Sequence, residues 1–180
     1  MKIKIGFGAI LLPSVLLLSG ARVSSLLALL SAILFHELGH LIMILILKKK
    51  ISAVTLEPFG ARIIIGDEIS YGQEILIALT GPAASLLLFF LLGHGDTADC
   101  SLFLGIINIL PVPTLDGGRV LECAVSCFFG PRAGSLATRI CGKIFAFLLW
   151  LISVYLVLRY NGGFDLFVFS CFLAVMTLKK

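Results

Sequence analysis

Six apolar segments, together too apolar for a soluble domain, dominate this sequence. They are approximately Ile5–Leu18, Val23–Leu47, Ile75–Leu92, Cys100–Val112, Ile144–Leu158 and Phe164–Leu178. Hydrophobic residues make up 59% of the 180-residue chain and charged residues only 13%. Because a helix needs about 20 apolar residues to cross a bilayer, the sequence predicts an all-α polytopic membrane protein. We expect about six transmembrane helices in a single domain over residues 1–180.

The positions of Lys and Arg predict the orientation in the lipid bilayer. If the N-terminus is cytoplasmic, the outside loops hold only Arg22 and Arg159. The inside regions then hold Lys2, Lys4, Lys48, Lys49, Lys50, Arg62, Arg119, Arg132, Arg139, Lys143, Lys179 and Lys180. Since cytoplasmic loops carry the excess of basic residues, we expect both termini to be cytoplasmic. No basic stripe with interleaved aromatic residues is present, so no nucleic-acid partner is expected.

The first apolar segment has two interpretations. It is short and follows basic residues, as the apolar part of a cleaved signal peptide does. A second long apolar segment follows at once. We therefore favour a retained first transmembrane span.

Two of the predicted cytoplasmic loops are long enough to have structure. Residues 51–65 alternate apolar side chains around Glu57-Pro58-Phe59-Gly60, which predicts a β-hairpin with a Pro/Gly turn. This hairpin is too apolar for a freely solvated loop, so we expect it to be membrane-associated. Residues 117–143 are mixed in character and are predicted to contain a short helix at 119–128.

A possible metal site lies inside the second apolar segment, where residues 36–40 read His-Glu-Leu-Gly-His. On a helix, His36 and His40 lie one turn apart on the same face, so both imidazoles can bind one metal ion. Glu37 lies between them and can act as a general base on a metal-bound water. Because ionisable groups within hydrocarbon are costly, they mark a functional site by default.

A hydrolytic metal site of this kind usually has three protein ligands, so a third is needed. Asp165 lies in an apolar segment, but it is predicted at the far end of the sixth span. Asp116 follows two prolines and precedes two glycines at the inner end of the fourth segment. Broken backbone at membrane depth is tolerated only where it is buried in protein or lines a cavity. An unwound segment could therefore carry the Asp116 carboxylate to the metal.

The motif HExxH, followed by NxxPxxxLDGG on a later segment, resembles the site-2 protease family of intramembrane zinc metalloproteases. The whole chain is similar to the minimal sporulation-type branch, whose members process pro-sigma factors, without its CBS domain. The resemblance implies zinc bound by His36, His40 and Asp116, with Glu37 as the catalytic base and Asn108 orienting or polarising the substrate. It also implies a membrane-tethered protein substrate, the lipid bilayer as environment, and a membrane-bound inhibitor or regulator.

Members of the family often carry GPxxN in the third span, whereas this chain has Gly81-Pro82-Ala83-Ala84-Ser85. We assign no polar role to Ser85 and interpret the segment as small residues for close helix contact. Of the five cysteines, Cys123 and Cys127 have a spacing that a metal site could use. We expect them instead to be reduced thiols, because buried Cys is a common small apolar residue.

Three alternatives remain open from the sequence. The His and Glu residues could form a buried polar cluster that joins helices, although the sequence gives such a cluster no partner. The chain could be a non-proteolytic membrane zinc-binding protein or transporter, although a transporter would need deep ionisable residues in several spans. It could also be a different metalloprotease with a Glu or His as third ligand, although no such residue lies in the third, fifth or sixth span.

Overall fold

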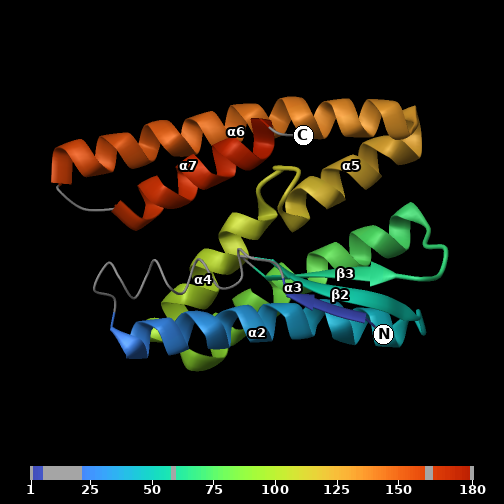
Figure 1. Cartoon of the computed structure of the whole chain (residues 1–180), viewed down its shortest axis with the longest axis horizontal. Helices are drawn as coiled ribbons and strands as arrows, with labels where there is room; N and C mark the ends of the chain where they lie inside the picture. The colour runs from blue at the N-terminus through green and yellow to red at the C-terminus, as the bar shows by residue number, and fades with distance from the viewer. Residues whose placement is uncertain (1, 6–21, 58–59, 161–163, 179–180) are drawn as a thin grey trace. The chain divides into compact units, whose positions relative to one another are not determined.

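The computed structural model describes residues 2–5, 22–57, 60–160 and 164–178. Its elements, drawn in Figure 1, are β1 (Lys2–Ile5), α2 (Val23–Ile46), β2 (Ile51–Glu57), β3 (Gly60–Ile65), α3 (Tyr71–Leu92), α4 (Asp96–Ile109), α5 (Asp116–Phe129), α6 (Pro131–Tyr160) and α7 (Phe164–Leu178). The chain forms two compact units, Met1–Ile107 and Asn108–Lys180. The single domain expected over residues 1–180 stays a prediction.

In the first unit, α2 and α3 pack very closely. Small residues such as Ala28, Ala32 and Gly39 lie on the buried face of α2. A Cβ atom on Gly39 would lie 2.8 Å from the Cβ of Ala84 and would also overlap the backbone carbonyl of Thr80. Close approach of two apolar helices at small residues is typical of membrane proteins. The backbone of α3 is thereby brought next to the face of α2 that carries His36 and His40.

The ends of α3 follow from local sequence. Ser70 and Gln73 form a capping box, in which each side chain accepts a hydrogen bond from the other residue's backbone N–H. The helix ends at Gly93, which has φ +71°, a conformation that favours glycine. After this turn α4 returns along α3, and a Cβ on Gly105 would lie 3.3 Å from the Cβ of Ser85.

The predicted hairpin is present. Strands β2 and β3 pair antiparallel, with Ile51 opposite Ile65 and Glu57 opposite Gly60, while Pro58 and Phe59 lie outside the described residues. Strand β1 pairs parallel with β2, with Lys2 opposite Ala53. The sequence does not predict this third strand, because Ile5 begins the first predicted apolar segment. The remainder of that predicted span, residues 6–18, lies outside the described part of the chain.

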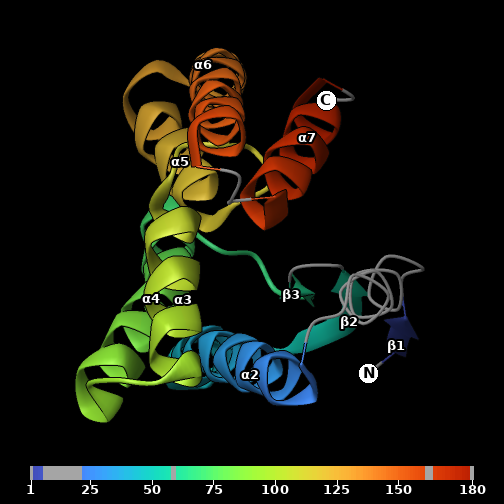
Figure 2. The same cartoon turned by 90° about the vertical axis from the view of Figure 1, so that its left-hand side faces the viewer.

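In the second unit, three helices pack on one another, as Figure 2 also shows. Gly130 has φ +85° and separates α5 from α6, and Pro131 begins α6 at a position where proline is favoured. Gly134 of α6 lies against α5, because a Cβ there would overlap Ser126 and the carbonyl of Glu122. Between α6 and α7, the buried hydroxyls of Ser153 and Ser170 are 2.9 Å apart.

The predicted loop at 117–143 is almost entirely helical. The short helix expected at 119–128 is present and extends from Asp116 to Phe129. The rest of the expected loop is the first part of α6, which begins at Pro131 rather than near Ile144. Its Arg132, Arg139 and Lys143 made this part look like a loop, but packing on α5 keeps it helical.

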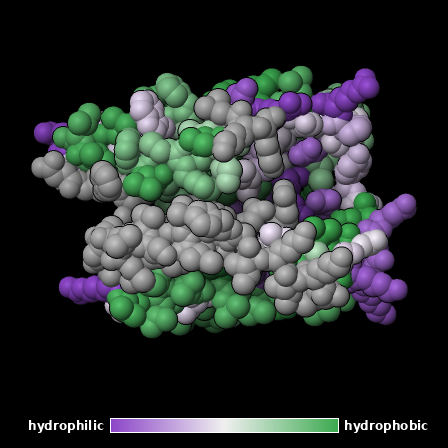
Figure 3. All heavy atoms as spheres, in the orientation of Figure 1, coloured by the Kyte–Doolittle hydropathy of each residue, from purple (hydrophilic) through white to green (hydrophobic). Residues whose placement is uncertain are grey.

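Within the described part of the chain, three helices, α2, α3 and α6, are long and apolar enough to cross a membrane. Helices α4 and α7 have 14 and 15 residues, fewer than the roughly 20 of a full span. Large apolar side chains such as Leu27, Leu34 and Leu45 of α2 are exposed, and hydrophobic residues cover much of the outer surface of that helix in Figure 3. Such a surface suits a lipid environment.

Candidate metal centre

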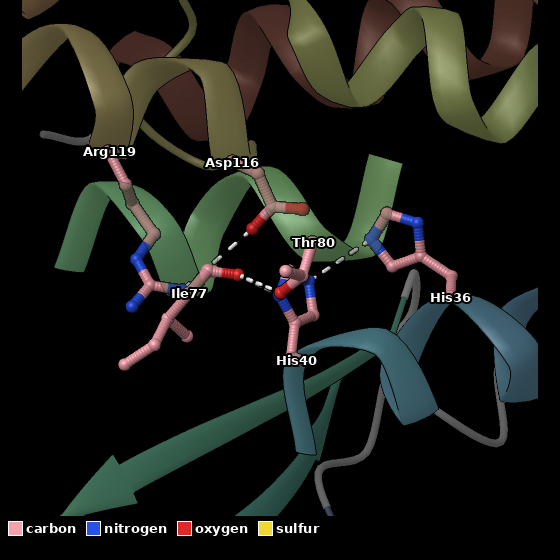
Figure 4. A network of polar contacts seen from close by, with 6 residues as sticks. All are labelled: His36, His40, Ile77, Thr80, Asp116 and Arg119. Atoms are coloured by element: carbon pink, nitrogen blue, oxygen red, sulfur yellow. Dashed lines mark hydrogen bonds and ion pairs between the residues drawn. The ribbon is translucent and has the colours of Figure 1, made fainter. Parts of the chain in front are cut away.

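The two histidines of the motif converge on one point, as expected from their spacing. Both side chains are buried on α2, His36 at 3% and His40 at 5% exposure. Their Nε2 atoms lie 3.3 Å apart, and the two rings meet edge to face. Figure 4 shows both rings pointing from α2 toward α3. Residues one turn apart on a helix point to the same side, and this side of α2 is buried.

Each imidazole has a second contact with α3 through its other nitrogen. His40 Nδ1 lies 2.7 Å from the backbone carbonyl of Ile77, which also accepts a hydrogen bond from the Thr80 hydroxyl (Figure 4). Because a carbonyl only accepts, His40 Nδ1 carries a proton. A neutral imidazole then has its free lone pair on Nε2. His36 Nδ1 lies 2.9 Å from the hydroxyl of Ser85.

Gly81 of α3 lies directly against the two Nε2 atoms. A Cβ atom on Gly81 would lie 2.7 Å from His36 Nε2 and would overlap His40 Nε2. Glycine therefore leaves room beside both ε nitrogens, where any larger residue would place a methyl group. Paired, buried imidazole nitrogens with room beside them fit a metal ion that prefers nitrogen ligands, as zinc does.

Glu37 follows His36 on the same turn of α2 and is half-buried. Glu37 lies between His36 and His40 on α2, and the turns on either side of this motif are apolar. The helix therefore holds Glu37 next to His36 in the chain, in the motif whose glutamate is the general base.

The segment between α4 and α5, residues 110–115, lies in the second unit and leads directly to Asp116, and its backbone is broken as expected. Helix α4 ends at Ile109, and short turns close with hydrogen bonds from Val112 N to Leu110 O and from Leu115 N to Val112 O, at 2.8 and 2.9 Å. A Cβ on Gly117 would overlap the Ile109 carbonyl. The close approach of the backbone at residue 117 to this carbonyl therefore requires glycine directly after Asp116.

Asp116 is the first residue of α5 and is 8% exposed. A carboxylate at a helix N-terminus is stabilised by the helix dipole. One of its oxygens lies 3.8 Å from a guanidinium nitrogen of Arg119 (Figure 4). Asn108, in the last turn of α4, is also 8% exposed. Both predicted polar residues are thus buried, as functional groups within a membrane usually are.

Among the residues that the structure describes, the buried side chains that could hold a metal ion are two imidazoles and one carboxylate, those of His36, His40 and Asp116. This set of nitrogen and oxygen donors is one that zinc accepts. Ser85 is a residue that sequence reasoning missed, since it was given no polar role. The available signal was its spacing: Ser85 follows Gly81 by four residues and so shares its helix face. The Ile77 carbonyl has no such signal, because any residue supplies one.

Comparison with known proteins agrees with the class of protein that this fold and site define, a polytopic membrane protein with an HExxH metal centre. Peptidase family M50 matches residues 97–158. The site-2 protease from Methanocaldococcus jannaschii has the same fold, with a TM-score of 0.74 at 22% sequence identity, over 98% of this chain and 89% of that one.

Curated relatives support the same family. Stage IV sporulation protein FB of Bacillus subtilis is 30% identical over 119 residues, which are 58% of this chain and 41% of the relative. The putative zinc metalloprotease Rip3 of Mycobacterium tuberculosis is 31% identical over 142 residues, 67% of this chain and 36% of the relative. The chain thus spans less than half the length of these relatives. These matches confirm the resemblance to the site-2 protease family that the two motifs predicted.

Proposed function

We propose that this protein is an intramembrane zinc metalloendopeptidase that hydrolyses a peptide bond in or near the membrane segment of a tethered protein. The observation that carries the proposal is the pair of buried imidazoles on α2, whose Nε2 atoms lie 3.3 Å apart with Gly81 beside them. Glu37 on the same helical turn adds the base that hydrolysis needs. Relatives described as putative zinc metalloproteases support the choice of metal.

Three residues hold the zinc ion in this proposal. His36 and His40 would each bind the ion through Nε2, because His40 Nδ1 donates to the Ile77 carbonyl and His36 Nδ1 lies against the Ser85 hydroxyl. Asp116 supplies the third ligand, an oxygen. A bound zinc ion lowers the pKa of a coordinated water molecule and polarises a carbonyl group. Three protein ligands leave a fourth position for water or substrate.

Two residues of the chain carry out the proton and substrate steps. The Glu37 carboxylate accepts the proton of the attacking water and later delivers it to the leaving amine. The buried Asn108 side chain donates from its amide to the substrate carbonyl, where negative charge develops during attack. A hydrogen-bond donor stabilises developing charge more strongly where bulk water is excluded, and the low exposure of Asn108 suits this function.

The substrate must present an unwound backbone, because a helix uses its carbonyls in i to i−4 hydrogen bonds. Strand β3 lies at one edge of the β1–β2–β3 sheet. An extended substrate segment can add to such an edge through main-chain hydrogen bonds. We therefore propose that the membrane-associated hairpin holds an extended segment of the substrate.

The orientation and biological role complete the proposal. We place both termini in the cytoplasm from the distribution of Lys and Arg, so that the product is released there. The similarity to stage IV sporulation protein FB favours a membrane-tethered pro-sigma factor as substrate. We propose that a membrane-bound inhibitor or regulator limits the activity of this protease.

Reconstitution in lipid vesicles tests the proposed activity. The purified protein, supplied with zinc, should cleave a membrane-tethered pro-sigma-type reporter within or beside its membrane segment. A zinc chelator should abolish cleavage, and added zinc should restore it. Cleavage that persists in the chelator, or that occurs only in a soluble part far from the membrane, would contradict the proposal.

A further inference from the structure

We propose that Ser85 is a positioning residue that holds His36 in its metal-binding form, an inference that rests on the zinc site proposed above. The Ser85 hydroxyl lies 2.9 Å from His36 Nδ1. Ser85 itself is completely buried, with 0% exposure. It belongs to α3, whereas both proposed histidine ligands belong to α2. The contact therefore ties the ring to a second helix.

The chemistry of imidazole explains why this contact matters. A neutral histidine that binds a metal through Nε2 carries its proton on Nδ1. In a buried site that N–H needs an acceptor, because leaving it unsatisfied costs free energy. Metal-binding histidines therefore donate their second N–H to an acceptor that fixes the ring. For His36 that acceptor is the Ser85 hydroxyl.

His40 supplies an internal comparison. Its Nδ1 donates to the Ile77 carbonyl, which is fixed in the helix backbone and can only accept. The two histidines thus have matching outer contacts from the same helix, one from backbone and one from a side chain. Only the side-chain contact, at Ser85, can be removed by substitution.

Packing explains why a residue as small as serine stands at this position. A Cβ on Gly105 of α4 would lie 3.3 Å from the Cβ of Ser85, so little room remains between α3 and α4. Gly81, one turn earlier on α3, lies against the same histidine pair. Serine supplies a hydroxyl acceptor within that limit.

Zinc affinity of the full-length protein tests the inference. In Ser85→Ala, the zinc dissociation constant, measured by competition with a chelator, should rise about 10- to 100-fold. The matched control is Ser101→Ala, which also removes one fully buried serine hydroxyl, but one with no hydrogen-bond partner among the described residues. Its zinc affinity should equal that of the wild type. Equal affinity in Ser85→Ala, or equal losses in both variants, would overturn the inference.

A second measurement does not depend on any variant folding. In the zinc-loaded wild-type protein, the ¹⁵N chemical shifts of the His36 ring should show the proton on Nδ1. A proton on Nε2 would overturn the inference. A wild-type protein that binds no zinc would overturn the proposed function and this inference with it. Tight zinc binding by both wild type and Ser85→Ala overturns the inference alone.

Discussion

Gly81 lies so close to His40 that a Cβ atom in its place would overlap His40 Nε2. We therefore predict that Gly81→Ala loses zinc and proteolytic activity together, because the added methyl group occupies the room beside the histidine pair. Gly72→Ala in the same helix is the matched control, since a Cβ there meets nothing within 4 Å. Zinc content and cleavage should be measured for both variants. Wild-type zinc content in Gly81→Ala would show that the metal binds elsewhere.

Replacement of Glu37 by Gln tests the general base. Gln keeps the size of the side chain but cannot accept a proton at neutral pH, so zinc should stay bound. Turnover should fall by about 10²- to 10⁴-fold. The measurement is single-turnover cleavage of a tethered substrate by zinc-loaded protein. A Glu37→Gln protein that cleaves at the wild-type rate would exclude this residue as the base.

Labelling of cysteines tests the orientation. Cys127 is exposed on α5, in a region predicted to be cytoplasmic, and His94 is exposed in the turn between α3 and α4, predicted to be outside. The test uses intact cells that express a variant in which Cys127 is the sole cysteine. A maleimide that cannot cross the membrane should not label this protein. Adding His94→Cys should make it labelled from outside. The reverse pattern would overturn the orientation inferred from Lys and Arg.

The substrate should need to unwind before it is cut. Replacing Gly, Pro or Asn near the scissile bond by Leu should slow cleavage without abolishing binding, because Leu favours the helix that hides backbone carbonyls. Cleavage rates and binding are compared for the two substrates in the same vesicles. Equal cleavage rates for the two would contradict the proposed mode of substrate entry.

Most of the helical framework could be predicted from hydropathy, because long apolar runs have few alternatives in a bilayer. The predicted sixth segment has the same bounds as α7, and α2 differs from its predicted segment by one residue. Strand β1 could not be predicted, because its parallel pairing with β2 joins Lys2 to Ala53, far along the chain. The early start of α6 depends on the contact of Gly134 with α5, which composition does not reveal.

The part of the candidate site that lies on one helical turn could be predicted from the sequence. His36, Glu37 and His40 follow from their spacing alone, and the broken backbone before Asp116 follows from Pro111, Pro113 and the two glycines. The contact of Ser85 with His36 was not predicted, because the spacing of Ser85 from Gly81 gives only a shared helix face, and the contact also depends on how closely α2 and α3 approach. The roles of His36, Glu37, His40, Asn108 and Asp116 remain predictions from the two motifs.

We propose that His36, His40 and Asp116 together bind one zinc ion. The most direct test is the zinc content of purified wild-type protein and of Asp116→Ala, with Glu37→Gln as the control that changes a carboxylate without removing a ligand. The wild type and Glu37→Gln should hold about one zinc ion per chain. Asp116→Ala should hold much less. Full zinc occupancy in Asp116→Ala would contradict the claim, because the third ligand would then be another residue.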